Sequence, residues 1–188
     1  MASETLTNFT YDDLLQMPDD GRHYEIIDGE LIVNASPIPR HQIIAGRIYT
    51  ELALYLRASP IGIVFIAPLD VVFTERWVLE PDILYIRNAR KSIVTRTNIS
   101  GAPDLAVEVL SASTRKKDEI TKRRAYEEFG VGEYWILDPD LESVKIYRRD
   151  AAGRYVRVTE ISTESEGAAI GSPLFPGLAI ALAELFAE

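Results

Sequence analysis

The chain has 188 residues, of which 47% are hydrophobic and 26% charged, which is ordinary for a globular protein with a sizeable core. It contains no cysteine, which excludes disulfides and thiolate metal sites, and its apolar runs are too short to predict a transmembrane helix. We therefore expect one domain over residues 1–188, in a cytoplasmic protein with no membrane anchor.

The formal net charge of -9 argues mildly against a nucleic-acid partner, because affinity for DNA comes largely from lysine and arginine. The basic residues are nevertheless concentrated in two stretches, residues 87–96 and 115–124. A basic stretch is more often a solvated helix face than a nucleic-acid contact, so composition alone still argues mildly against nucleic acid.

The N-terminal third predicts a short helix, a hairpin and a long helix. Tyr11–Met17 is the candidate short helix, and Tyr24–Val33 reads as two strands joined by Asp28-Gly29, a pair that tolerates the positive dihedral angles of a tight turn. In His41–Arg57, apolar residues recur with helical spacing along one face.

The remainder predicts short strands interrupted by one helix. The strand candidates are Ile63–Phe73 with a break or bulge at Pro68, Asp82–Ile86, Asp104–Leu110, Glu133–Leu137, Ser143–Arg148 and Tyr155–Ile161; the helix is Lys116–Phe129, and Pro173–Phe186 adds a turn and an apolar segment. This order predicts an α/β fold in which helices flank a mixed sheet, preceded by the N-terminal hairpin.

Glu108 is a carboxylate in the middle of the apolar strand 104–110. Burying an ionised group costs several kcal/mol unless a cation meets it. The cation could be a metal ion at a functional site, or an arginine of the basic helix in a structural ion pair. Alternatively, this is an edge strand whose other face meets water.

Asp82 opens the preceding strand candidate, directly after Pro81. Alone it could be a turn residue, but two carboxylates at the ends of neighbouring strands could share one cation. Mg²⁺ typically takes one or two carboxylates together with waters and phosphate oxygens.

Lys122 lies on the inward stripe of the helix 116–129, together with Ala125, Tyr126 and Phe129. Beside buried carboxylates it could orient a water molecule or stabilise charge on a phosphate. The alternative is a weak helical pair with Asp118, four residues earlier. We expect Lys122→Met to spare folding, since methionine fills a similar volume.

These residues resemble the PD-(D/E)xK nuclease superfamily, which has a Pro-Asp at one strand, an acidic residue on the next and a lysine nearby. More closely, the chain resembles the Uma-two family of restriction-endonuclease-like domains. The matching segments are YEIIDGELIV, SPIPRHQ, EPDILYI, GAPDLAVEVLSAST, RAYEEFGVGEYWILDP and SPLFPGLAI.

The resemblance implies a restriction-endonuclease-like core and a Mg²⁺ or Mn²⁺ site built from Asp82, Glu108 and the carbonyl of Val109. In the superfamily the lysine normally follows two residues after the acidic residue, where this chain has Leu110. The resemblance therefore implies a lysine that has moved to the following helix. Lys122 fits that position, with Lys116 and Lys117 as rivals.

Two further residues come from the same resemblance. The superfamily often carries a glutamate on its first helix, where Glu51 stands, but the family motif points to Glu25, which we favour as a catalytic residue. His41 opens the helix 41–57 on its inward face, and we expect it beside the site rather than as a metal ligand.

Three functions are compatible with these residues. The first is a metal-dependent endonuclease acting on DNA, with Arg115, Lys116 and Lys117 among the phosphate contacts. The second is a non-catalytic nucleic-acid-binding or regulatory module. The third is a structural or interaction protein, in which Asp82, Glu108 and Lys122 share no pocket.

We also predict a homodimer, because nucleases of this kind often pair to reach two strands. The C-terminal GLAIALAELF is one candidate contact surface, although it could equally pack in the core.

Overall fold

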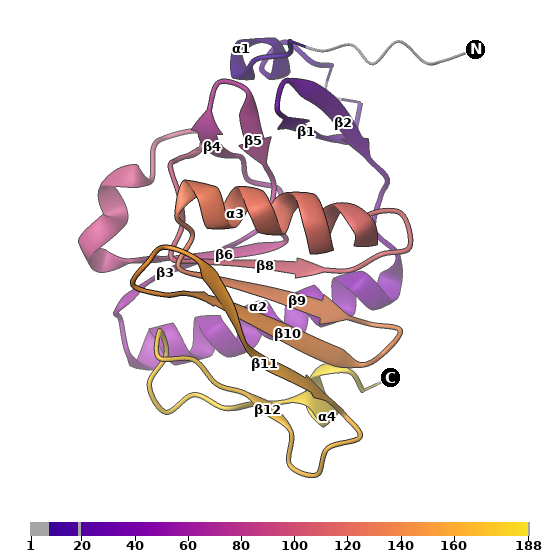
Figure 1. Ribbon diagram of the computed structural model, residues 1–188, viewed down its shortest axis with the longest axis vertical. Coiled ribbons are helices and arrows are strands. Elements are labelled where there is room, and N and C mark those ends of the chain that lie inside the picture. The colour runs from indigo at the N-terminus through magenta and orange to yellow at the C-terminus, as the bar shows by residue number, and fades with distance from the viewer. Residues whose placement is uncertain (1–7, 19, 188) are drawn as a thin grey trace.

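A six-stranded mixed sheet forms the centre of the protein, in the order β11-β10-β9-β8-β6-β3 (Figure 1). Its strands are β3 Gly62–Ile66, β6 Ile83–Arg87, β8 Leu105–Val109, β9 Glu133–Asp138, β10 Ser143–Arg149 and β11 Tyr155–Ser162. Strands β8 and β9 run parallel, and the other neighbours pair antiparallel. The structure is a computed structural model that describes residues 8–18 and 20–187.

Helices cover both faces of this sheet, as Figure 1 shows. On one face lies α2, Pro39–Ala58, whose apolar side packs with Leu105, Val107 and Val109 of β8. On the other lies the helix formed by η2, Lys117–Lys122, and α3, Arg123–Phe129. Because side chains alternate along a strand, Glu108 faces this second helix.

A second, five-stranded sheet adjoins the first in the order β2-β1-β5-β4-β7. Its strands are β1 His23–Ile27, β2 Glu30–Asn34, β4 Val71–Thr74, β5 Trp77–Leu79 and β7 Ile99–Ser100. Strands β1 and β2 form the predicted hairpin, and its turn residues Asp28 and Gly29 adopt φ values of 50° and 80°. The prediction of a mixed sheet flanked by helices with an N-terminal hairpin is confirmed.

Short elements complete the described chain. They are α1 Tyr11–Leu14, the 3-10 helix η1 Asn88–Ile93, β12 Ala169–Ile170, β13 Ile180–Ala181 and α4 Leu182–Leu185. The C-terminal Leu182, Leu185 and Phe186 are buried in the core beside α2. The C-terminal segment is therefore core rather than a contact surface, and the homodimer stays a prediction without that support. No helix in the described residues is long and apolar enough to cross a membrane.

The break expected at Pro68 within Ile63–Phe73 is confirmed, but the prediction that this whole range lies in the central sheet is wrong. Strand β3 ends at Ile66 in the central sheet, whereas β4 begins at Val71 in the second sheet. Ala67 still donates to the carbonyl of Asp82, but Pro68 has no N–H to continue the ladder. The chain leaves the central sheet at this point.

The helix predicted over Lys116–Phe129 exists, but its first part, η2, is π-helical. A π-helical segment bonds residue i to residue i+5 and so inserts an extra residue into the turn. Asp118 and Lys122 are the buried residues of η2. Both side chains therefore face the sheet, directly opposite Glu108.

Candidate active site

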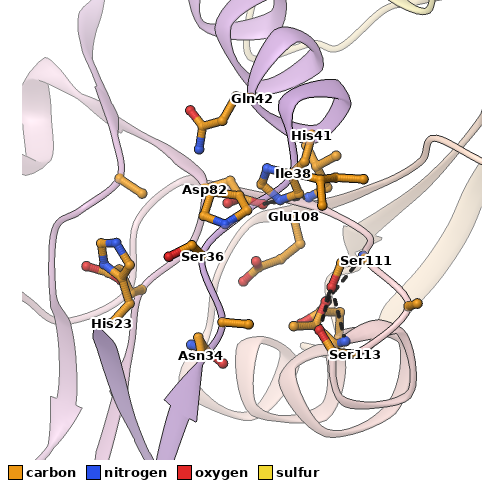
Figure 2. A pocket seen from close by; sticks show the side chains of 18 of the residues that line it. His23, Asn34, Ser36, Ile38, His41, Gln42, Asp82, Glu108, Ser111 and Ser113 are labelled. Atoms are coloured by element: carbon orange, nitrogen blue, oxygen red, sulfur yellow. Dashed lines mark hydrogen bonds and ion pairs between the residues drawn. The ribbon is translucent and has the colours of Figure 1, made fainter. Parts of the chain in front are cut away.

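A cavity of about 550 Å³ opens where the end of β8, the approach to β6, the start of α2 and the start of η2 meet. Four carboxylates line it, those of Glu80, Asp82, Glu108 and Asp118, together with Lys122. Figure 2 shows Glu108 and Asp82 in the middle of this cavity. The third alternative, a structural or interaction protein, predicted that Asp82, Glu108 and Lys122 share no pocket. The structure contradicts that prediction, because all three line this cavity.

Glu108 lies at the floor of the cavity with 4% of its surface exposed. Its Oε1 accepts hydrogen bonds from Lys122 Nζ at 2.9 Å and Tyr126 Oη at 2.8 Å. Burial raises the pKa of Glu108 well above its ordinary value; Lys122 opposes this shift, and Asp118, Asp82 and Glu25 add to it. The lysine alone does not offset burial and three neighbouring carboxylates.

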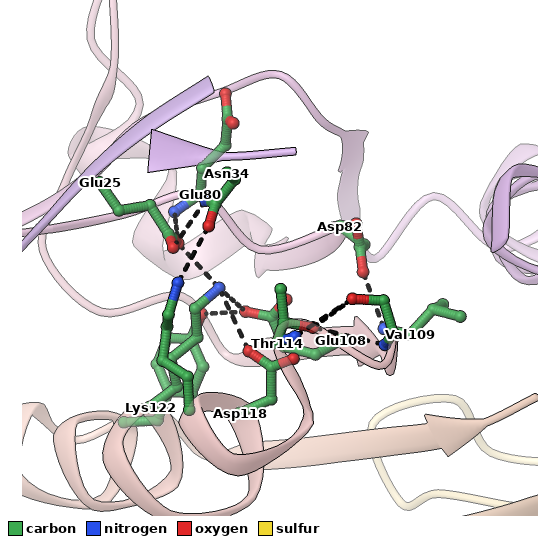
Figure 3. A network of polar contacts seen from close by, with 12 residues as sticks. Glu25, Asn34, Glu80, Asp82, Glu108, Val109, Thr114, Asp118 and Lys122 are labelled. Carbon is green, nitrogen blue, oxygen red and sulfur yellow. Dashed lines mark hydrogen bonds and ion pairs between the residues drawn. The ribbon is translucent and has the colours of Figure 1, made fainter. Parts of the chain in front are cut away.

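Lys122 is buried among carboxylates, as Figure 3 shows. Its Nζ lies 2.7 Å from Glu25 Oε1, 2.9 Å from Glu108 Oε1 and 3.6 Å from Asp118 Oδ1. Burial by itself would lower the pKa of Lys122, but these carboxylates raise it well above the ordinary value. The lysine therefore carries its charge inside the protein.

The two rival lysines lie elsewhere. Lys117 Nζ donates to Asn34 Oδ1 at 3.0 Å, and burial lowers its pKa. Lys116 is exposed. Of the three candidates, the fold brings Lys122 to the carboxylates of Glu108 and Asp118.

Glu25 comes from β1 and is fully buried. Its Oε1 contacts Lys122 Nζ and accepts from the backbone N–H of Glu80 at 2.9 Å, while its Oε2 accepts from Asn34 Nδ2 at 2.9 Å. Burial would raise the pKa of Glu25, but these partners, Lys122 above all, lower it. Glu25 is thus an ionised counterion of the lysine, with both oxygens engaged.

Asp82 lies just before β6, at the cavity wall. Its Oδ2 accepts from the backbone N–H of Val109 at 2.7 Å and lies 3.2 Å from Nε2 of His41. Burial would lower the pKa of His41, but Asp82 outweighs it and the pKa is raised. His41 therefore stands beside the site and holds Asp82 in place.

Asp118 is the site residue that sequence reasoning missed, because its spacing to Lys122 was interpreted as an ordinary helical pair. It is 1% exposed, and its Oδ1 accepts no hydrogen bond in the structure. Burial raises its pKa, while Lys122 and the Thr114 side chain lower it. The only sequence signal was its position one turn before Lys122.

A second histidine, His23 of β1, also lines the cavity. Its Nδ1 lies 3.0 Å from Oε2 of Glu80. Burial raises the pKa of Glu80 to about 7; His23 opposes the shift, and Asp70 and Glu25 add to it. Both histidines of the chain thus contact a carboxylate next to Pro81.

Comparison with known proteins gives the family directly. A family model described as "Uma2: Putative restriction endonuclease" matches residues 11–183, nearly the whole chain. The chain belongs to the Uma2 family.

A solved structure supports the fold. It is the crystal structure of a protein described as "a putative nuclease belonging to DUF820" from Anabaena variabilis, and it superimposes with a TM-score of 0.75 at 22% identity. The match covers 94% of this chain and 97% of that one. No protein of curated function matches the chain. The chain thus belongs to a family described as putative restriction endonucleases and shares the fold of this solved structure.

The cavity of this Uma2 chain fits a hard divalent cation in the type of donor that it offers. Carboxylate oxygens are the ligands that Mg²⁺ prefers, and one or two carboxylates with waters suffice for it. Asp82 uses only its Oδ2, and Glu108 only its Oε1, for the protein contacts given above. Within residues 8–18 and 20–187, no three His, Cys, Asp or Glu side chains form a preassembled metal centre.

The predicted basic contacts divide into two kinds. The guanidinium of Arg115 binds both carboxylate oxygens of Asp138 and also Asp140, so the charge of Arg115 is already paired. Lys116 is exposed and Lys117 is bonded to Asn34. Lys116 is thus the most available of the three for a phosphate.

Proposed function

We propose that the cavity is the active site of a Mg²⁺- or Mn²⁺-dependent endonuclease that hydrolyses phosphodiester bonds of DNA. The observation that carries this proposal is the buried, charged Lys122, whose ammonium lies 2.9 Å from Glu108 in a cavity that also contains Asp82. Two carboxylates and a lysine lining one cavity are the parts that metal-assisted phosphodiester hydrolysis requires.

Asp82 and Glu108 are the proposed cation ligands, with the carbonyl of Val109 as a third donor. Val109 ends β8 and lines the cavity, and its N–H already anchors Asp82 at 2.7 Å. A bound divalent cation would supply charge stabilisation at the scissile phosphate.

Lys122 is the proposed partner of the attacking water. Glu25 and Glu108 fix its ammonium from two sides, which removes the rotational freedom of a long side chain before substrate binds. Glu25 acts in this scheme by holding Lys122, and His41 by holding Asp82.

Lys116 is the proposed phosphate contact outside the cavity, with Arg115 and Lys117 positioned next to it along the chain. Such contacts fix the position of a duplex without reading its sequence. A homodimer would present two cavities to two strands, and we retain it as part of the proposal.

The test is a cleavage assay on duplex DNA, single-stranded DNA and RNA, with Mg²⁺, with Mn²⁺ and with EDTA. The wild-type protein should cleave DNA only with a divalent cation, and Glu108→Ala should not cleave. Cleavage in EDTA would contradict the metal dependence. Cleavage of RNA but not of DNA would contradict the assignment of DNA as the substrate.

A non-catalytic nucleic-acid-binding module is the second candidate. It is favoured by Leu110 at the usual lysine position and by the net charge of -9. The two candidates differ in one result. The module predicts DNA binding without turnover at any cation concentration, even where the cation raises the melting temperature.

A further inference from the structure

We propose that Asp118 is an additional ligand of the cation, contributed by the π-helical segment η2. The inference rests on the proposed function, because it extends the metal site of Asp82, Glu108 and Val109. It adds a residue from a helix, whereas Glu108 and Val109 lie in β8 and Asp82 lies just before β6.

The contacts of the acidic residues at the site separate them. Glu25 has partners on both oxygens, and it does not line the cavity. Glu80 lines the cavity and pairs with His23. Asp82, Glu108 and Asp118 line it beside Lys122, and the Oδ1 of Asp118 has no hydrogen-bond partner.

The unpaired atoms independently indicate a missing polar ligand. In the described residues, two buried side-chain atoms have no hydrogen-bond partner, Oδ1 of Asp118 and Nδ1 of His41. Both residues are more than nine-tenths buried, and both line this same cavity. Unpaired buried polar groups are rare because each costs about 1–3 kcal/mol. Their coincidence in one cavity indicates a polar ligand there, and of the two atoms the carboxylate oxygen of Asp118 is the one that can bind a cation.

Lys122 does not supply the missing hydrogen bond to Asp118 Oδ1. Its Nζ is 3.6 Å from Asp118 Oδ1, beyond hydrogen-bond distance, while it bonds Glu25 and Glu108 at 2.7 and 2.9 Å. The ammonium of Lys122 thus lies closer to Glu25 and Glu108 than to Asp118. Asp118 therefore keeps its oxygen for the cavity.

The described residues hold no preassembled three-residue centre, so the assignment requires the carboxylates to move together when the cation binds. Like-charged carboxylates repel one another when no cation lies between them. We expect the cation to draw Asp118 toward Asp82 and Glu108, within a helix turn already widened by its π-helical bonding.

The experiment uses Tb³⁺, a hard cation that prefers oxygen ligands, and the full chain. Tyr126, whose hydroxyl is 2.8 Å from Glu108, serves as the sensitiser of its luminescence. Luminescence lifetimes in H₂O and D₂O count the water molecules bound to the ion. Asp118→Ala should add at least one bound water, because water replaces the lost carboxylate oxygen.

Two variants serve as matched controls. Glu119→Ala removes the next carboxylate along the same helix. Glu119 contacts Lys145 and does not line the cavity, so this variant should leave the number of bound waters unchanged. Glu25→Gln removes a partner of Lys122 without removing a cavity carboxylate, and should also leave it unchanged. If Asp118→Ala does not fold, Asp118→Asn with Mn²⁺ calorimetry replaces it, and at least tenfold weaker binding is expected.

The outcomes separate the two proposals. An unchanged water count in Asp118→Ala, or unchanged Mn²⁺ affinity in Asp118→Asn, overturns the role of Asp118 while leaving a two-carboxylate nuclease intact. Wild-type protein that binds neither Tb³⁺ nor Mn²⁺ overturns both. If Asp118→Ala gains a bound water and the two control variants do not, Asp118 is a direct ligand. The loss of a distant negative charge would not add a bound water.

Discussion

Lys122 Nζ lies 2.9 Å from Oε1 of Glu108, although the lysine belongs to a helix and the glutamate to the strand beneath it. The position two residues after Glu108 is Leu110, which is buried in the core beneath α3. In this chain the positive charge beside Glu108 comes from Lys122 of the helix packed on the sheet, and not from a lysine on the strand. Its place is fixed by Glu25 from the hairpin, so three elements must fold together to build it.

Replacing Lys122 with Met should destabilise the protein, contrary to the expectation from the sequence that it spares folding. The substitution leaves the ionised Glu25 buried without its cation, and loss of one partner from a buried pair costs about 3–5 kcal/mol. Urea unfolding measures the change. The double variant Lys122→Met/Glu25→Gln should recover part of the loss, and a single variant as stable as wild type would contradict the ion-pair network.

Replacing Glu108 with Gln should stabilise the cation-free protein at neutral pH. The pKa of Glu108 is raised in the folded state, mainly by burial, so its contribution is favourable below the ordinary carboxyl pKa and is lost as pH rises through the folded-state value. Glutamine cannot ionise and avoids that loss. Thermal melts at pH 5 and pH 8 should show a smaller pH dependence for the variant.

The control for this prediction is Glu133→Gln on the neighbouring strand β9. Glu133 is equally buried but has three partners, Arg148, Trp135 and Ser172, so the same substitution should destabilise. Stabilisation by both substitutions would show a general effect of removing negative charge, and not a strained Glu108.

Replacing Glu80 with Gln should flatten the stability profile between about pH 4.5 and pH 7. Burial raises the pKa of Glu80 to about 7, so the folded protein holds a proton there that the unfolded chain releases, and stability falls as pH rises through this window. Allowing for solvent screening at the cavity rim, the gain at pH 8 is about 1–2 kcal/mol. Chemical unfolding at pH 5 and pH 8 measures it, and an identical slope in both proteins would refute the assignment.

Glu108 and Lys122 could be identified from the sequence because each breaks a local pattern. A carboxylate inside an apolar strand and a lysine on the apolar stripe of a helix both require a partner, and they are each other's partner. Asp118 could not be found in this way. Its spacing of four residues reads as a routine helical pair with Lys122, and only the structure shows that both side chains are buried at the cavity.

The sequence also did not predict that residues 62–74 form two strands in two different sheets. Pro68 indicated a break, but sequence periodicity does not say that the chain continues in another sheet. That separation matters for the site, because Ala67 and Pro68 then line the cavity instead of lying within a strand. The contact of His23 with Glu80 also depends on this arrangement of two sheets, since it joins β1 to the approach of β6.

The most direct test of the account is single-turnover cleavage of a labelled DNA duplex in Mg²⁺ by wild type, Asp82→Ala, Glu108→Gln and the surface control Glu142→Gln. Glu142 pairs with Arg40 away from the cavity, so its variant should cleave like wild type. The two cavity variants should lose at least about a hundredfold in rate, since each alters a proposed ligand of the cation whose charge would stabilise the transition state. Cleavage by Asp82→Ala and Glu108→Gln at the wild-type rate would contradict the assignment of this cavity as the active site.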